Sequence, residues 1–327
     1  MFINKLVLPA IGGNGRAWQS MKPLIKAALP SLLLVMALTA PLIAAPVDDA
    51  DSAIHRGDYA TALKILRPLA EQGVAAAQDS LGAMYEYGLG VQQDYAEAIK
   101  LFREAADQGL ADAQDDLGFM YANARGVPLD NAEAIKWWGK AADQGDVGAQ
   151  HSLGTMYANG KGVSQDYVEA VKWFRKAADQ GFAEAQDDLG DIYANGKGVT
   201  QNYAEAVKWF RKAADQGNLN SQVMLGHMYH DGHGAPQSYA EAIKWWGKAA
   251  DQGDLNGQVM LGLMYDEGQG VPQDYVQAYK WYNLAAAKSS MKDTMAIGAR
   301  DRVAEKMTPQ QIAEAQRLAT EWKPDGR

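Results

Sequence analysis

Residues 140–145 read Lys-Ala-Ala-Asp-Gln-Gly, and the same six residues return unchanged at 176–181, 212–217 and 248–253. The closing glycine keeps a step of 36 residues and is found at positions 73, 109, 145, 181, 217 and 253. A fixed period of this length is typical of solenoids, in which each unit packs only against its neighbours. The 327 residues are therefore expected to form one elongated array rather than the two domains that length alone would suggest.

A second phrase keeps the same step, and it predicts the first helix of each unit. Leu-Gly pairs, each followed two residues later by Met-Tyr or Ile-Tyr, begin at positions 81, 117, 153, 189, 225 and 261. In the unit 110–145, Ala113, Leu117, Met120 and Tyr121 would share one apolar helical face. Gly118 falls within that face, where it costs about 1 kcal/mol relative to alanine, so it indicates a close helix–helix approach.

The second helix of each unit has a strong start signal. Asp130 and Glu133 have the spacing of a capping box, in which two side chains satisfy backbone N–H groups at the helix start. The equivalent pairs are Asp94/Glu97, Asp166/Glu169, Asn202/Glu205, Ser238/Glu241 and Asp274/Gln277. Each helix then ends at the recurring glycine. The sequence predicts an all-α fold, a right-handed α/α superhelical solenoid of 36-residue helix-turn-helix repeats.

These phrases together resemble the Sel1-like repeat, a 36-residue relative of the tetratricopeptide repeat. The pattern A-x-x-x-L-G-x-M-Y, then G-x-G-V-x-x-D-Y, then W-(W/F)-x-K-A-A-x-x-G recurs in six in-register copies over residues 74–289. Residues 48–73 are expected to form an N-terminal capping helix, and residues 290–327 C-terminal capping helices and a tail. The resemblance implies a bacterial scaffold whose first helices line a concave surface that binds proteins.

The first 47 residues are typical of an export signal. They contain no acidic residue, carry four basic ones, and run uncharged from Ala27 to Val47. The true start could be Met21, with a cleavage site at Ile43-Ala44-Ala45. An uncleaved membrane anchor is the alternative, although Pro30 and Pro41 interrupt the apolar run. We therefore expect a periplasmic or secreted protein, with the membrane as a partner only if this segment stays attached.

The net charge argues against nucleic acid as a partner, and the lack of cysteine excludes disulfide bonds. The whole chain has a net charge of -9, and removal of residues 1–47 leaves 27 basic against 40 acidic residues, a net charge of -13. Such an acidic body does not bind nucleic acid by neutralising phosphates. The chain has no cysteine, so packing alone must hold an exported protein together, without disulfides.

Three recurrent sequence features are explained better by a role in folding than by a role in catalysis or ligand binding. The paired glycines follow helices, not strands, so they indicate turns and not phosphate loops. The adjacent aromatic residues of each second helix, such as Trp137 and Trp138, are expected in the core, although an exposed member could stack on a polysaccharide. A row of seven lysines runs along the second helices, and five of them, such as Lys136, follow a glutamate by three residues, which neutralises most of the row.

His227, His230 and His233 flank Asp231 and are the local group that could bind a transition metal. The equivalent residues in other copies vary freely, so drift explains the histidines, and we expect neither a metal nor another cofactor. No grouping of nucleophile, base and orienting residue is apparent, so no catalytic residue is predicted.

The candidate binding surface follows the residues of the first helices that differ between copies, because packing does not dictate them. These residues are spaced i, i+4 and i+7 and form one stripe, which we place opposite the core face. The stripe is acidic at first and apolar later, and the selected binding residues are Asp112, Asp115, Phe119, Asp187, Asp191, Val223, His227, His230, Val259 and Leu263.

The leading interpretation is a non-catalytic scaffold in the bacterial envelope that holds a protein or peptide segment in its concave groove. Two alternatives stay open: a hydrolase of the β-lactamase-like type assigned to some cysteine-rich relatives, and a peptidoglycan- or polysaccharide-binding module. The oligomeric state and the identity of the partner are not predicted.

Overall fold

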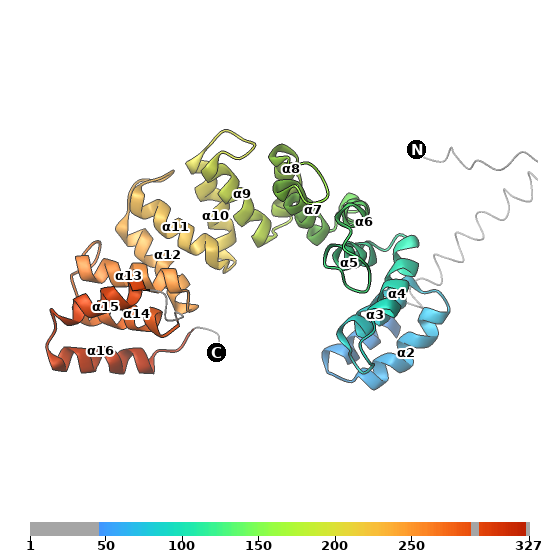
Figure 1. The fold of residues 1–327 in the computed structure, drawn as a ribbon, viewed down its shortest axis with the longest axis horizontal. Helices are drawn as coiled ribbons and strands as arrows, with labels where there is room; N and C mark the ends of the chain where they lie inside the picture. Colours follow the sequence, from blue (N-terminus) through green and yellow to red (C-terminus); the bar gives the residue numbers. More distant parts are fainter. Residues whose placement is uncertain (1–45, 289–293, 325–327) are drawn as a thin grey trace, which may run out of the picture. The chain divides into compact units, whose positions relative to one another are not determined.

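The computed structural model describes residues 46–288 and 294–324, and every regular element within them is an α-helix (Figure 1). Residues 46–55 are helical and precede the following helices: α2 (Tyr59–Glu71), α3 (Ala75–Tyr87), α4 (Tyr95–Asp107), α5 (Ala111–Ala122), α6 (Asn131–Asp143), α7 (Val147–Asn159), α8 (Tyr167–Asp179), α9 (Ala183–Asn195), α10 (Tyr203–Asp215), α11 (Leu219–Asp231), α12 (Tyr239–Asp251), α13 (Leu255–Glu267), α14 (Tyr275–Lys288), α15 (Thr294–Ala304) and α16 (Pro309–Glu321). The predicted all-α solenoid is confirmed. The helices form two compact units, divided between Gln108 and Gly109.

The N-terminal unit comprises the helical residues 46–55 and α2, α3 and α4. Its core contains Val47, Ala50, Leu66 and Leu81. The sequence predicted a single capping helix over 48–73, and the structure has two helical stretches there, because residues 46–55 present their own apolar face to α2. The predicted export signal and its cleavage site lie almost wholly outside the described residues; only its last two residues, 46 and 47, are within them.

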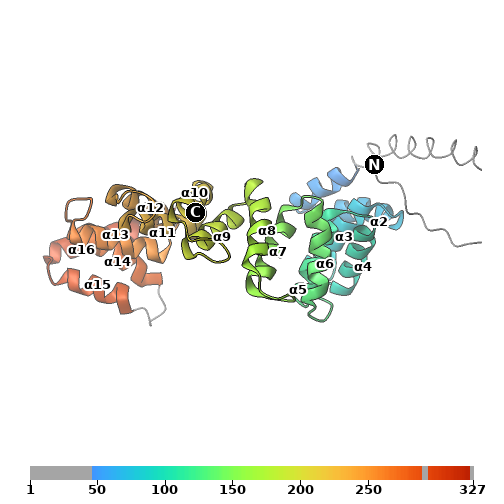
Figure 2. The same cartoon turned by 90° about the horizontal axis from the view of Figure 1, so that it is seen from above.

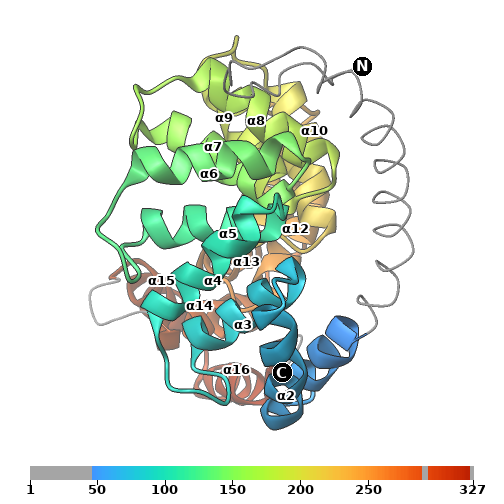
Figure 3. The same cartoon turned by 90° about the vertical axis from the view of Figure 1, so that its right-hand side faces the viewer.

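The C-terminal unit stacks α5 to α14 as consecutive helix pairs. Figure 2 shows α5 to α8 side by side, and Figure 3 shows α6 against α7. The first helices of neighbouring repeats also touch directly, α5 against α7 and α9 against α11. This close spacing places the first helices on the inner side of the stack. Helices α15 and α16 both pack against α14 and cover the end of the array.

Only half of the predicted capping box is present at the start of α6, and the backbone N–H of the N-cap residue has another partner. The N-cap half is present: the Asp130 side chain accepts a hydrogen bond from the Glu133 backbone N–H at 2.9 Å. The Asp130 backbone N–H, however, donates to the carbonyl of Tyr121 on α5 at 3.1 Å. Glu133 is therefore free to pair with Lys136 at 2.7 Å. The loop is thus tied to the end of the first helix, a bond that recurs in every repeat.

The six glycines within the first helices permit close approach, as predicted. A Cβ placed on Gly118 would lie 2.6 Å from the indole ring of Trp138 on α6. The equivalent glycines on α7 and α9 would meet Phe174 and Phe210 at similarly short distances. Each repeat therefore closes by setting an aromatic ring from its second helix directly on the backbone of its first helix.

Among residues 46–288 and 294–324, no helix combines the length and the apolar character needed to cross a bilayer.

Candidate functional site

The stripe selected from the sequence is half-buried rather than open, because its first position in each helix meets the next repeat. The carboxylate of Asp115 on α5 lies beside Gly148 on α7, where an added Cβ would be 3.4 Å away. Nε2 of His151 on α7 lies 2.8 Å from Oδ2 of Asp188 on α9. Variation between copies at these positions therefore reflects pairing between neighbours and not, as the sequence reasoning assumed, freedom from packing.

Asp187 is the clearest case of this inter-repeat pairing. Its carboxylate accepts hydrogen bonds from the side-chain amide of Asn220, at 2.9 Å, and from the hydroxyl of Ser221, both on α11. Burial raises the pKa of Asp187, while these two hydrogen bonds oppose the rise. Part of the predicted acidic surface thus holds α9 against α11.

Two other carboxylates of the stripe carry negative charge that is poorly compensated. Burial, and then the neighbouring Asp146, raise the pKa of Asp115 to about 6. Burial, and then Asp187 and Asp188, raise the pKa of Asp191 to about 6, although Lys197 acts in the opposite direction. Because both groups are charged against unfavourable surroundings above that pH, a cation brought to this face would be attracted to it.

The remaining residues of the acidic half differ in exposure. Asp112 is exposed in the first turn of α5. Phe119 is half-buried, packs against the Trp138 cluster, and lies under the guanidinium of Arg125, with 4.7 Å between Cζ and the ring centre. Asp112 is thus accessible to a partner, whereas only part of the Phe119 side chain is exposed.

The apolar half is less accessible than the sequence reasoning required. Val223 is 7% exposed and is a buried core residue, which corrects its assignment as an apolar anchor on the surface. Val259 is half-buried against the cluster formed by α14, α15 and α16. Leu263 is half-buried beside the core that contains Trp281. Leu263 and Val259 retain some exposed surface, and Val223 does not.

Two of the three histidines near residue 230 pack on the same tryptophan, and the third packs on a tyrosine. His227 stands edge-on to Trp246, with 5.3 Å between ring centres, and burial lowers its pKa. His230 packs on the same Trp246, and its Nδ1 is 2.6 Å from the Asp231 carboxylate. His233 instead stacks on Tyr203. Within the described residues, no group of three or more potential metal ligands converges anywhere.

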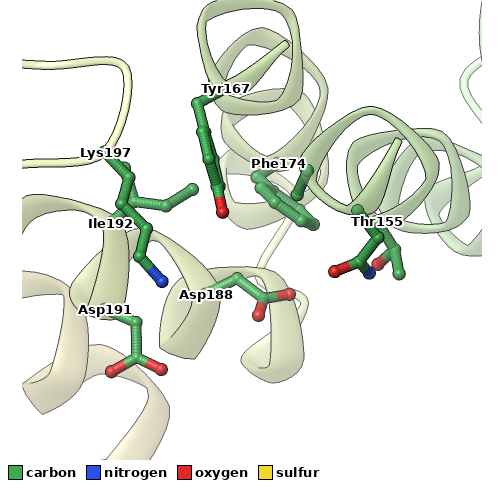
Figure 4. A pocket seen from close by; sticks show the side chains of 9 residues that line it. Thr155, Tyr167, Phe174, Asp188, Asp191, Ile192 and Lys197 are labelled. Carbon is green, nitrogen blue, oxygen red and sulfur yellow. The ribbon is translucent and has the colours of Figure 1, made fainter. Parts of the chain in front are cut away.

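A pocket of about 170 Å³ opens between α7, α8 and α9, and Figure 4 shows its lining side chains. Asp188, Asp191 and Lys197 supply charge, and Tyr167 and Phe174 supply aromatic surface. The ammonium of Lys197 lies 5.7 Å from the centre of the Tyr167 ring. A basic side chain entering this pocket would meet both carboxylates and aromatic rings.

The aromatic pairs and the lysine row behave as predicted. Trp137 and Trp138 are 7% and 6% exposed, so no open aromatic ladder supports polysaccharide binding there. The only half-exposed member among the tryptophans that begin these pairs is Trp173. Five lysines of the row pair with the glutamates three residues earlier, at 2.6 to 3.4 Å.

Sequence reasoning missed a line of buried glutamines that connects the repeats. Gln150 on α7 donates to the carbonyl of Ala142 in the preceding repeat at 3.2 Å, and its side-chain oxygen accepts from Gln180 at 2.8 Å. The same positions are linked in other repeats, at Gln78/Gln108, Gln114/Gln144, Gln186/Gln216 and Gln222/Gln252. The invariance of glutamine among the six copies, at an otherwise apolar face, was the signal that could have revealed it.

The family model of the Sel1 repeat matches six consecutive segments of the chain, at residues 75–110, 111–146, 147–182, 183–218, 219–254 and 255–290. These segments begin one residue later than the units read from the sequence. No curated protein matches the chain.

Two solved structures are similar to this one over most of the chain. A protective antigen present in uropathogenic Escherichia coli strains is 33% identical, with a TM-score of 0.69, over 80% of this chain and 63% of the antigen. The chain thus spans less than two thirds of that protein's length. A Sel1 repeat protein from Oxalobacter formigenes is 34% identical, with a TM-score of 0.67, over 74% of this chain and all of that protein.

Proposed function

The chain belongs to the Sel1 repeat family, and on that premise we propose that it is a non-catalytic scaffold of the bacterial envelope that binds a basic protein segment. Sel1 repeat proteins generally mediate protein–protein interaction. The binding face is the inner face of α5, α7 and α9, where the first helices of successive repeats lie against one another.

The observation that carries the proposal is the accumulation of carboxylates on α5 and α9. Asp112 is exposed on α5, and Asp188 and Asp191 line the pocket beside α9. The raised pKa of Asp191 shows that its charge is under-compensated, so a lysine or arginine side chain would relieve unfavourable charge as it binds. On helix α7, between them, Gly148 lies beside Asp115 and Thr155 lines the pocket, so small residues stand at these two places.

The apolar half contributes less than the acidic half to this proposal. With Val223 in the core, Leu263 and Val259 are the residual apolar surface further along the stripe. Charge therefore steers and orients the partner, and affinity rests on the pocket of Figure 4, where one side chain can be buried.

The test compares a labelled peptide of alternating lysine and serine with its glutamate counterpart, by fluorescence anisotropy at several salt concentrations. We expect only the lysine peptide to bind, and the double variant Asp112→Lys with Asp191→Lys to slow its association about tenfold at low salt and to flatten the salt dependence.

The matched control reverses two charges on the second helices, in Lys136→Glu with Lys172→Glu, and should bind the lysine peptide at least as well as the parent chain. Binding that ignores the aspartate changes and is lost in the lysine variant would show that the outer face carries the function, and the assignment to the inner face would be wrong.

Export is the second part of the proposal. It rests on the uncharged run from Ala27 to Val47 and on the basic residues that precede this run. Because Val47 packs in the N-terminal core, we propose that cleavage falls before residue 47, at the Ile43-Ala44-Ala45 site. Mass spectrometry of protein recovered from the periplasm of an expressing bacterium should give a mature chain that begins at Pro46. A full-length chain in the membrane fraction would support the anchor instead.

A further inference from the structure

The first complete repeat departs from the others at two positions of its second helix. Tryptophan begins the aromatic pair in five repeats, at 137, 173, 209, 245 and 281, but the first repeat has Leu101 there. Three residues later, the next four repeats have lysine, and the first has Glu104. Because the register is otherwise unbroken, these residues occupy equivalent places in the fold, and the repeats can be compared directly.

In the complete pattern, the tryptophan is enclosed by cations. Trp209 on α10 is 5% exposed, and the ammonium of Lys212 lies 3.8 Å from the centre of its ring. The guanidinium of Arg175 on α8 lies 5.9 Å from the same ring and donates to the hydroxyl of Tyr193 on α9. The indole thus fills the space between the second helices of neighbouring repeats, with an arginine and a tyrosine as its walls.

The corresponding place in the N-terminal unit is a cavity of about 590 Å³ between α2 and α4. Arg67 and Tyr85, the equivalents of Arg175 and Tyr193, line it, together with Leu101 and Glu104. The rim residues Arg67 and Glu104 are exposed, whereas Leu101 is buried at the floor. The cavity is therefore open to solvent and has the walls of an indole site without the indole.

We propose that this cavity is a docking site for an aromatic side chain of a protein partner, and that tryptophan is the side chain that fits it best. The partner's backbone would stay outside the open rim while the ring enters. This site lies on the second helices of the N-terminal unit and is independent of the inner face assigned above.

The choice of tryptophan over phenylalanine follows from the carboxylates around the cavity. In three repeats that have tryptophan at the position of Leu101, the indole N–H groups of Trp137, Trp209 and Trp245 are buried with no hydrogen-bond partner. In the N-terminal unit, Glu71, Glu97 and Glu104 all line the cavity. Glu104 is held by the side-chain amide of Gln78 at 2.8 Å, which orients an acceptor at the rim. An incoming indole therefore gains a hydrogen bond that the internal indoles lack.

The experiment measures binding of N-acetyl-tryptophanamide to the purified full-length chain by saturation-transfer NMR. Leu101→Trp fills the cavity with the repeat's own side chain, and we expect the affinity to fall at least about tenfold. The matched control, Leu129→Trp, makes the same change on an exposed loop residue and should bind as the parent does. Undiminished binding by a folded Leu101→Trp chain would overturn the proposal.

Two further arms keep the test decisive. If Leu101→Trp does not reproduce the parent's circular dichroism, Leu101→Phe replaces it, and unchanged binding by that variant overturns the proposal equally. The 1-methyl derivative of N-acetyl-tryptophanamide cannot donate the indole hydrogen bond, so it should bind several-fold more weakly. Equal binding of the two compounds would refute the preference for tryptophan.

Discussion

At the residue scale, the glycines of this array have two opposite roles that the sequence alone separates only in part. Gly118 was predicted to allow close helix approach, and the indole of Trp138 does lie on it. Gly139, inside α6, has nothing within 4 Å of an added Cβ, and it replaces the arginine found at the equivalent positions 103 and 175. The Gly118 position is glycine in all six repeats, whereas the Gly139 position is glycine in only one other repeat, at Gly247, and this difference already indicated which glycine is structural.

Gly118→Ala is therefore expected to lower the free energy of unfolding by about 1–3 kcal/mol, because the steric clash with Trp138 exceeds the gain in helix propensity. Gly139→Ala, the matched control, should raise it by up to about 1 kcal/mol. Urea denaturation followed by circular dichroism measures both. Stabilisation by both substitutions would mean that Trp138 can move away without cost.

The buried glutamines show where residue-level reasoning fell short. Buried Gln150 and its exposed partner Gln180 each donate to a backbone carbonyl of the preceding repeat, and Gln180 also donates to the side-chain oxygen of Gln150. Polar residues were expected on exposed faces. Gln150 is buried instead, because the carbonyl to which it donates lies in another repeat. Such a partnership depends on two chain segments coming together, which one helix pattern does not reveal.

At the element scale, the starts and ends of the helices were predicted well, and their side-by-side contacts were not. Asp94, Asp130 and Asp166 cap their helices as expected, because N-cap chemistry is local. The stripe on the first helices was misjudged, since Asp115 and Asp187 were assigned to a face open to a partner and instead meet the next repeat. Which residue lies opposite which depends on the angle between helices, and the sequence does not specify that angle.

The carboxylates between α5 and α7 predict a pH dependence of stability. The pKa of Asp115 is about 6 in the folded chain and near 3.8 when exposed, so the folded state holds the proton more tightly. Stability should therefore rise as the pH falls from about 7 to 4, and this gain is lost as the pH rises through 6.

Asp115→Asn should stabilise the chain by roughly 1–2 kcal/mol at pH 7.5 and by little at pH 4, because asparagine is isosteric with the protonated acid. Asp143→Asn makes the same charge change on an exposed residue and should show no such trend. Thermal unfolding at the two pH values distinguishes them. An equal gain at both pH values would show that burial of Asp115 does not control its protonation.

At the scale of the whole molecule, the period of 36 predicted both the architecture and the family, because each repeat uses the same local rules. The N-terminal end departs from these rules: the structure has two helical stretches where a single capping helix was expected, and the first repeat has Leu101 where later repeats have tryptophan. The division between Gln108 and Gly109 was not foreseen, since the repeat register runs through it without interruption.

The two compact units predict that the array can be shortened at this division. In a solenoid, stability is approximately a sum over repeats and their nearest neighbours, so residues 109–327 retain all the helix pairs from α5 onward and should fold alone. We expect this fragment to keep the helicity per residue of the parent and an unfolding midpoint within about 5 °C of it.

A fragment of residues 127–327 is the matched control, because it removes α5 and leaves α6 without the backbone on which Trp138 rests. That surface would be an exposed apolar face, and the fragment should unfold at a lower temperature and associate. Calorimetry and light scattering compare the two fragments. If residues 109–327 lose as much stability as residues 127–327, then the repeats depend on the whole array, and the candidate sites on the two units could not act independently.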